Sequence, residues 1–139
     1  MNSTVVIDAS VALSWILPGE KTNKTILLRN YAVENSNVKL LVPTIFWYEV
    51  ANVLWVAVKR ERIVQSGAIE GLRALLDFRI DTAATDPTVI ISISFAQNIA
   101  VYDSAYLSVA KIYDANLWTI DRGLVKAAKN LNIFVEPEL

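Results

Sequence analysis

Residues 4–10 read TVVIDAS, and this stretch decides the class of fold. Its first four residues are β-branched, and the apolar ones among them occupy both faces of an extended chain. Asp8 places a charge where the apolar run stops, so we expect a strand that ends at this residue. A strand that is apolar on both faces indicates a parallel sheet with helices on each side.

Outward from this stretch, short apolar segments alternate with helical ones. Strands are expected at residues 4–7, 39–42, 80–83, 117–120 and 133–135, and helices at 11–17, 23–34, 45–60, 66–78, 87–97, 103–113 and 122–131. Right-handed crossovers between such strands produce an α/β fold with a doubly wound parallel sheet. The length of 139 residues suits one domain, which we expect to extend over residues 1–139.

Composition limits the chemistry that this chain can perform. It contains no Cys, which excludes disulfides and thiolate nucleophiles, and no His, which excludes imidazole acid–base catalysis. The 13 Lys and Arg residues nearly balance the 14 Asp and Glu residues, which argues against nucleic-acid binding through a broadly basic surface. Any hydrolytic activity must therefore use carboxylates, hydroxyls, Lys or Arg, with or without a metal ion.

The apolar stretch from residue 40 to residue 58 has the length of a membrane helix, but its sequence favours another interpretation. Pro43 breaks it early, and Glu49 and Asn52 place polar groups inside it. We expect a short strand and a buried helix here, in a soluble cytoplasmic protein without a membrane partner. The hydrophobic fraction of 54% also indicates that another subunit covers part of the surface.

Four acidic residues stand in apolar surroundings, unlike the acids of a solvated surface. Asp8 and Asp121 each follow an expected strand. Glu49 is the only charged residue of PTIFWYEVANVLWVAV, and Asp103 is the only one of AVYDSAYLSVA. Taken singly, each of these acids could serve the fold and not a function. Each aspartate could be a helix cap or a loop residue, and Glu49 could pair with a buried Lys or Arg.

The expected topology brings these four acids to one edge of the sheet. In a doubly wound sheet, the carboxyl ends of the strands lie beside the N-termini of the following helices, and ligands bind there. Asp8 and Asp121 fall at strand ends, and Glu49 falls in the second turn of the helix after residues 39–42. Asp103 opens its helix, where the helix dipole favours the charged form.

Carboxylates that gather at one site repel one another unless a cation lies between them. Oxygen ligands without His or Cys favour Mg²⁺ or Mn²⁺. Such a site supports phosphodiester hydrolysis, in which the ion activates a water and neutralises charge on the phosphate. Catalytic and metal-ligating roles are therefore predicted for Asp8, Glu49, Asp103 and Asp121.

Three polar residues beside these acids are predicted to support them. Ser10 and Thr119 carry hydroxyls near Asp8 and Asp121, suited to orient a carboxylate or a water. Arg122 follows Asp121 directly and is the candidate for contact with a substrate phosphate. The structural alternatives are an N-cap for Ser10, a strand side chain for Thr119 and a salt bridge for Arg122.

Four fragments of the sequence together resemble one family. VIDASV, EVANVLW, VYDSAYLSVAK and LWTIDRGLVKAAK occur in this order, and the similarity extends over essentially the whole chain. They are similar to the PIN-domain ribonucleases, specifically the VapC-like toxins of VapBC toxin–antitoxin systems. The resemblance implies a single PIN domain whose five-stranded parallel sheet has the strand order 3-2-1-4-5.

The resemblance also implies a function and partners. Its acidic pocket matches Asp8, Glu49, Asp103 and Asp121, and its hydroxyl positions match Ser10 and Thr119. Such a pocket binds Mg²⁺ or Mn²⁺ and cleaves RNA, so the expected activity is that of a metal-dependent endoribonuclease, a hydrolase. VapC-like proteins form homodimers or higher homo-oligomers. A VapB-like antitoxin inhibits them by laying a peptide across the groove, often with a basic side chain in the acidic pocket.

Two other functions are compatible with these residues. A catalytically silent PIN-fold module would bind a protein partner and cleave no RNA. A phosphatase with an aspartate nucleophile fits less well, because Ser10 stands where the common DxD arrangement has its second aspartate.

The helix expected at residues 45–60 is apolar nearly all round, which is more than one sheet can cover. We therefore expect Trp47, Val50 and Leu54 to contact a second subunit or an antitoxin peptide.

Overall fold

The computed structural model describes residues 3–137, and a five-stranded parallel sheet forms its centre. The strands are β1 (Thr4–Ile7), β2 (Lys39–Pro43), β3 (Ile80–Ala83), β4 (Asn116–Trp118) and β5 (Val135–Glu136). Their order is β3-β2-β1-β4-β5, and each neighbouring pair is parallel. The predicted fold class and strand order are confirmed. Residues 1, 2, 138 and 139 of the predicted domain lie outside the described part.

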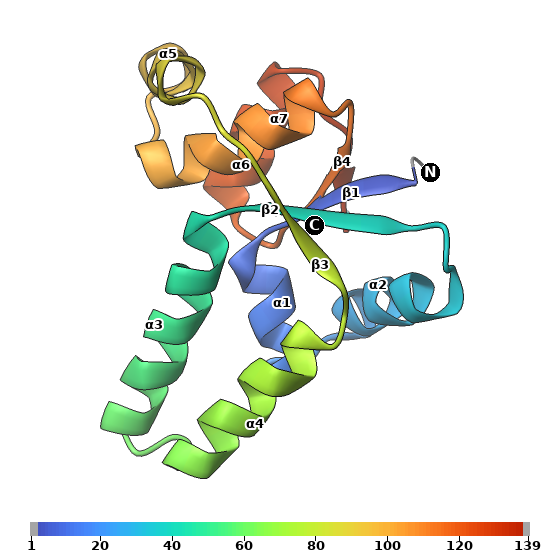
Figure 1. Cartoon of the computed structure of the whole chain (residues 1–139). Coiled ribbons are helices and arrows are strands. Elements are labelled where there is room, and N and C mark those ends of the chain that lie inside the picture. Colours follow the sequence, from blue (N-terminus) through green and yellow to red (C-terminus); the bar gives the residue numbers. More distant parts are fainter. Residues whose placement is uncertain (1–2, 138–139) are drawn as a thin grey trace.

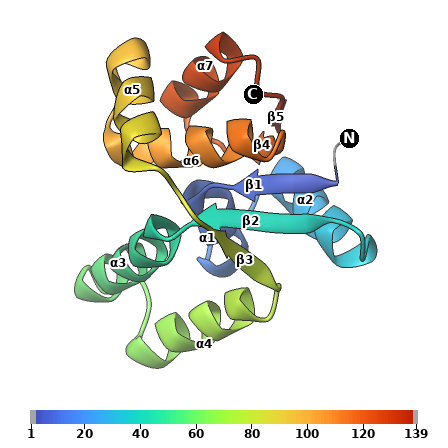
Figure 2. The ribbon, with the colours of Figure 1, turned by 45° about the horizontal axis from the view of Figure 1, so that its top comes forward.

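Helices lie on both faces of the sheet. They are α1 (Ala9–Ile16), α2 (Asn23–Glu34), α3 (Ile45–Lys59), α4 (Gln65–Leu76), α5 (Pro87–Gln97), α6 (Val101–Ile112) and α7 (Arg122–Asn130). Figures 1 and 2 show α1 to α4 on one side of the sheet and α5 to α7 on the other, with α5 at the outer margin. This arrangement explains why the central strands are apolar on both faces.

The core is built from the strand that opens the chain and from large side chains of the helices above and below it. Val5, Val6 and Ile7 are fully buried, and so are Tyr106 and Trp118. Burial of one such aliphatic side chain stabilises the fold by about 1.5–3 kcal/mol. The first strand therefore anchors both helical layers.

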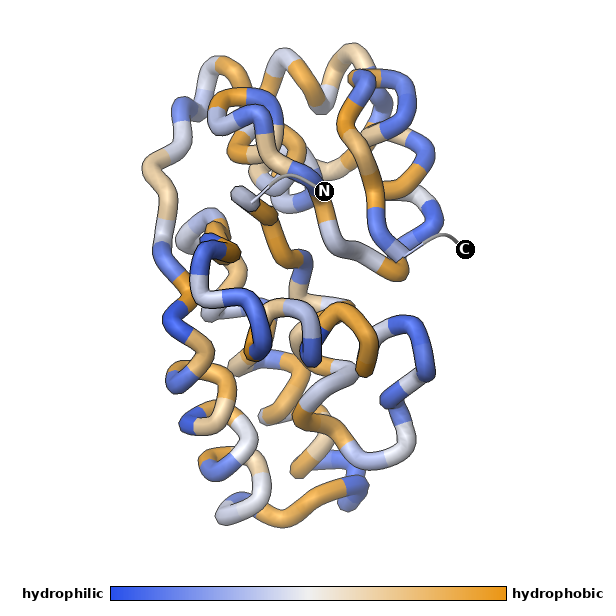
Figure 3. The backbone as a smooth tube through the Cα atoms, turned by 90° about the vertical axis from the view of Figure 1, so that its right-hand side faces the viewer, coloured by the Kyte–Doolittle hydropathy of each residue, from blue (hydrophilic) through white to orange (hydrophobic). Residues whose placement is uncertain are grey.

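Helix α3 buries one stripe and exposes another. Phe46, Val50 and Leu54 recur at intervals of four residues and are 0%, 0% and 3% exposed, because this spacing aligns them toward the core. Figure 3 shows hydrophobic and hydrophilic residues alternating along several of the other helices. The prediction that Val50 and Leu54 contact a second chain is therefore wrong, while that for the half-buried Trp47 stays a prediction. The large apolar side chains that α3 exposes are instead Tyr48 and Trp55.

Several element boundaries differ from the prediction. The apolar stretch from 40 to 58 divides into β2 and α3 as expected, and no helix within residues 3–137 is both long and apolar enough to cross a bilayer.

Other boundaries lie elsewhere than expected. Helix α1 begins at Ala9 because the extended backbone of Asp8 serves as its N-cap, so Ser10 lies inside the helix. Helix α6 begins after Ala100, which puts Asp103 in its first turn. Strand β5 begins two residues later than expected.

The register of the sheet sets the position of the polar residues that follow the strands. Ile7 of β1 is aligned with Trp118 of β4. The residues after them, Asp8 and Thr119, therefore meet at the carboxyl edge of the sheet. Helix α6 runs back toward the start of β4, so its N-terminal turn lies at the same edge.

Candidate active site

Asp8 is the most enclosed of the predicted acids, and two hydroxyl groups hold its carboxylate. Its side chain is 7% exposed. Ser10 Oγ donates a hydrogen bond of 2.7 Å to Asp8 Oδ2, and Thr119 Oγ1 donates one of 2.8 Å to the same oxygen. The carboxylate is therefore held in one orientation by residues from α1 and from the end of β4.

The two hydroxyls are themselves directed by backbone groups. The N–H of Ile120 donates to Ser10 Oγ at 3.2 Å, and the N–H of Asp121 donates to Thr119 Oγ1 at 3.0 Å. Because each hydroxyl oxygen accepts a backbone N–H, its own proton is free for Asp8. The structure thus gives Ser10 no N-capping role; it joins the first helix to the segment after β4.

Glu49 lies in the second turn of α3, half-buried, and its partner is a tyrosine. Tyr106 of α6 donates its phenolic proton to Glu49 Oε1 at 2.7 Å. No Lys or Arg among residues 3–137 forms an ion pair with Glu49, so the alternative of a buried basic partner is wrong within this part of the chain. The predicted acid remains without a neutralising charge.

The other two predicted acids flank this pair. Asp103 lies half-buried in the first turn of α6 and accepts no hydrogen bond from another residue of the described range. Asp121 is exposed and caps α7 by accepting the N–H of Leu124 at 2.9 Å. Arg122 follows as the first residue of α7, exposed and without an ion pair to any residue in 3–137.

Burial and mutual repulsion raise the pKa values of three of these carboxyls. For Asp8, Glu49 and Asp103, burial is the largest cause. The charge of Asp121 raises the pKa of both Asp8 and Asp103, and the charges of Asp8 and Asp103 raise that of Glu49. The four acids therefore form one electrostatic site, in which like charges accumulate without a cation from the described chain.

The donor set of this site fits a hard divalent cation that keeps much of its water. No three acidic side chains within residues 3–137 lie close enough together to hold one ion between them. Mg²⁺ is commonly bound through one or two carboxylates plus waters and substrate phosphates, and Mn²⁺ also prefers oxygen ligands. A hydrated ion of this kind is compatible with the separation of the acids and with their uncompensated charge.

Sequence reasoning missed Tyr106. The available signal was its spacing, since Tyr106 follows Asp103 by three residues and therefore lies on the same face of α6. Nothing in the sequence indicates that this face meets Glu49 of α3, from which it is 57 residues distant along the chain.

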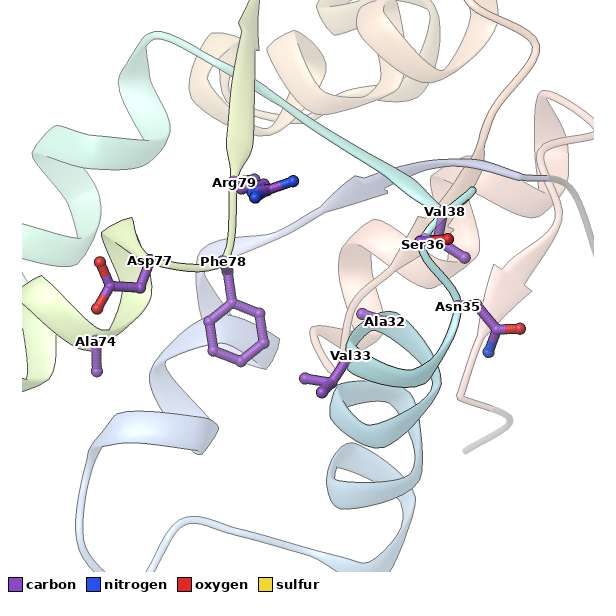
Figure 4. Close-up of a pocket in the computed structure, with 9 residues that line it drawn as sticks. All are labelled: Ala32, Val33, Asn35, Ser36, Val38, Ala74, Asp77, Phe78 and Arg79. Carbon is purple, nitrogen blue, oxygen red and sulfur yellow. The ribbon is translucent and has the colours of Figure 1, made fainter.

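A cavity of about 380 Å³ lies away from the four acids, where β2 and β3 begin (Figure 4). The end of α2 and the segment between α4 and β3 line it, and Figure 4 shows Phe78, Asp77 and Arg79 on one side of it. Since Asp77 is the one acidic residue among those that line it, this cavity does not contribute to the acidic site.

Comparisons with known proteins agree with this architecture. The family model of the PIN domain matches residues 5–130. Ribonuclease VapC3 from Pyrobaculum aerophilum is 26% identical over 126 residues, covering 88% of this chain and 92% of that protein. Among solved structures, PAE2754 from Pyrobaculum aerophilum has a TM-score of 0.74 at 18% identity, over 95% of this chain and 88% of that one. FitAcB from Neisseria gonorrhoeae has a TM-score of 0.60 at 18% identity, over 94% of this chain and 95% of that one.

Proposed function

This chain belongs to the PIN domain family, and from that membership we propose that it is a metal-dependent endoribonuclease, the toxin of a VapBC-type toxin–antitoxin pair. The similarity to Ribonuclease VapC3 supports RNA as the substrate. A toxin that cleaves cellular RNA acts in the cytoplasm, which is therefore its proposed location.

One observation carries this proposal: four acids from separate elements share one edge of the sheet and have no basic partner within residues 3–137. Keeping buried like charges together destabilises a fold, and a divalent cation relieves that repulsion. The absence of His and Cys leaves oxygen as the ligand atom, which supports Mg²⁺ or Mn²⁺. Asp8, Glu49, Asp103 and Asp121 are the proposed ligands, some of them bound directly and the others through waters that the ion keeps.

Each residue of the site has a proposed task. The bound ion supplies positive charge that activates a water and neutralises the phosphate. Ser10 and Thr119 hold the Asp8 carboxylate in its orientation, as their hydrogen bonds of 2.7 and 2.8 Å support. Arg122, exposed next to Asp121, contacts a phosphate of the RNA.

A second copy of the chain is the proposed partner of α5. This helix is strongly apolar yet none of its residues is buried within the chain. Val89, Ile91 and Phe95 are 37%, 45% and 80% exposed. A monomer rarely leaves so apolar a helix in water, which supports a homodimer that covers it.

A VapB-like antitoxin is the proposed partner of the groove between α3 and α4. The groove measures about 390 Å³ and is lined mainly by apolar side chains, among them Trp55, Ile69 and Leu72. An amphipathic helix of a partner suits a groove of this character.

RNA cleavage by the purified chain tests the proposed function. Wild-type protein is expected to cut single-stranded or structured RNA with Mg²⁺ or Mn²⁺ and to stop when EDTA is added. Asp8→Asn and Asp103→Asn should abolish the cut, while Asp81→Asn, a matched change of an exposed acid on β3, should leave it unchanged. If wild type and all three variants cleaved RNA equally, Asp8 and Asp103 would not be required for the activity. A wild-type protein that cleaves no RNA, yet binds a protein partner tightly, would support the silent-module alternative.

A further inference from the structure

The contact between Tyr106 and Glu49 joins two helices at the centre of the acidic site. The phenol of Tyr106 lies in a fully buried side chain, and a buried phenol generally needs a hydrogen-bond partner. Here the partner is Glu49 Oε1, at 2.7 Å. The site therefore contains a buried donor that is committed to one of the proposed ligands.

This contact has a fixed direction. Tyr106 donates its phenolic proton and Glu49 Oε1 accepts it, because a carboxylate oxygen offers only lone pairs. A hydrogen bond from a hydroxyl to a carboxylate is among the stronger hydrogen bonds in proteins. The phenol is therefore a directional donor toward one oxygen of Glu49.

The contact also leaves one carboxylate oxygen free. Oε1 of Glu49 is occupied by Tyr106, and Oε2 accepts no hydrogen bond from another residue within 3–137. The charges of Asp8 and Asp103 both act on Glu49, so its carboxylate lies on the side of α3 that faces the other acids. Tyr106 thus restricts the rotation of a side chain that would otherwise be free in the second turn of a helix.

We propose that Tyr106 is a positioning residue, whose hydroxyl holds Glu49 in the orientation that binds the cation. This inference rests on the proposed function, because Glu49 is a metal ligand only within it. A purely structural phenol would stabilise the fold to the same extent whether or not Glu49 bound an ion. The two roles therefore differ in what the hydroxyl does for metal binding and turnover.

The test compares wild type, Tyr106→Phe and Tyr113→Phe, where Tyr113 is an exposed tyrosine at the far end of α6. Mn²⁺ binding is measured by titration calorimetry, and RNA cleavage is measured as separate kcat and KM values. Loss of a group that orients a metal ligand reduces metal affinity or activity by about 10–100-fold. We expect weaker Mn²⁺ binding and a lower kcat by this factor in Tyr106→Phe, an unchanged KM, and wild-type behaviour in Tyr113→Phe.

A double-mutant cycle with Glu49→Gln shows whether Tyr106 acts through Glu49. If it does, adding Tyr106→Phe to Glu49→Gln changes Mn²⁺ affinity no further. The inference would be overturned if Tyr106→Phe bound Mn²⁺ as tightly as wild type. It would also be overturned if Tyr106→Phe lowered Mn²⁺ affinity as much in the Glu49→Gln protein as it does in wild type. If wild type binds Mn²⁺ but cleaves no RNA, the proposed function fails, while the Mn²⁺ titrations still decide the role of Tyr106.

A measurement on the wild-type protein covers the case in which Tyr106→Phe does not fold. With tyrosines labelled with ¹³C at Cζ, substoichiometric Mn²⁺ should broaden the Tyr106 resonance much more than that of Tyr113, which is about 10 Å further along the helix. Equal broadening of both signals, or none, would contradict an ion bound beside the Tyr106 hydroxyl and with it the proposal.

Discussion

Thr119 Oγ1 lies 2.8 Å from Asp8 Oδ2, although 111 residues separate the two along the chain. The parallel register of β1 and β4 creates this proximity, since Ile7 and Trp118 are aligned and the next residues follow them. Thr119 is fully buried, and its hydroxyl also accepts the N–H of Asp121. One side chain therefore links two of the four acids.

Removal of this hydroxyl should reduce activity more than stability. Thr119→Val keeps the shape of the side chain but leaves Asp8 with one donor fewer, which typically costs about 1–3 kcal/mol for a buried group. We expect kcat for RNA cleavage to fall by about 10–100-fold, because the Asp8 carboxylate, a proposed metal ligand, loses its orientation. Thr119→Ser retains the hydroxyl and serves as the control. A Thr119→Val protein as active as Thr119→Ser would contradict this role.

The acids should make the metal-free protein less stable as pH rises. Asp8, Glu49 and Asp103 have pKa values raised above those of the unfolded chain, mainly by burial, so the folded state holds their protons more tightly. Their protonation therefore favours folding at pH values below the raised pKa values. This contribution is lost as pH rises from the ordinary carboxyl pKa, near 4, through the raised values.

Asp103→Asn isolates this effect, because Asp103 accepts no hydrogen bond from within residues 3–137. In EDTA at pH 8 the variant should unfold at a higher temperature than wild type, by roughly 2–8 °C for each 1 kcal/mol of relieved repulsion. At pH 4 the difference should largely disappear, and Asp81→Asn should show none at either pH. Calorimetric scans that find Asp103→Asn no more stable at pH 8 would count against buried repulsion.

Arg122 should affect RNA binding rather than the chemical step. Its guanidinium is exposed beside Asp121 and forms no ion pair with residues 3–137, so it is available to a phosphate. Arg122→Ala is expected to raise KM several-fold, as loss of about 1 kcal/mol of binding implies, with kcat unchanged. The salt dependence of RNA binding should also weaken by roughly 0.7 in the log–log slope. Lys129→Ala, near the far end of α7, is the control, and an equal KM for the two variants would exclude a specific role for Arg122.

Phe95 should be essential to self-association. It is 80% exposed on α5, and a charge at the centre of an apolar interface is costly to bury. Phe95→Lys should shift the mass measured by light scattering from about twice 15.5 kDa to 15.5 kDa. Leu27→Lys alters a side chain of α2 that is 67% exposed and should leave the mass unchanged. A dimer that persists in Phe95→Lys would place the interface elsewhere.

The strands and the positions of the acids relative to them were predictable from local patterns. The run Thr4–Ile7 is apolar on both faces and ends at a charge, and the structure has the strand at these residues. Asp121 was expected at the end of a strand, and it follows β4 closely as the N-cap of α7. Such features depend on residues that are neighbours in the chain, which is why periodicity and capping reveal them.

The role of Ser10 could not be predicted in the same way. A serine before a helical segment favours N-capping, but Asp8 takes the N-cap position with an extended backbone and the helix begins at Ala9. Ser10 is then free to donate to Asp8 and to accept the N–H of Ile120, 110 residues away. From the sequence alone, Ser10 could be a helix N-cap or a hydrogen-bond donor to Asp8. The contact with Ile120, far away in the chain, is what the sequence could not show.

By itself, the sequence determined a parallel α/β sheet and restricted any metal ligands to oxygen atoms, because strand burial and the lack of His and Cys are properties of residue types and their order. Only the tertiary structure decided that Tyr106 meets Glu49 and that α3 turns Val50 inward and Trp55 outward. Those contacts depend on how helices far apart in the chain pack across the sheet, and a helix that is apolar nearly all round does not show in its sequence which face meets the core.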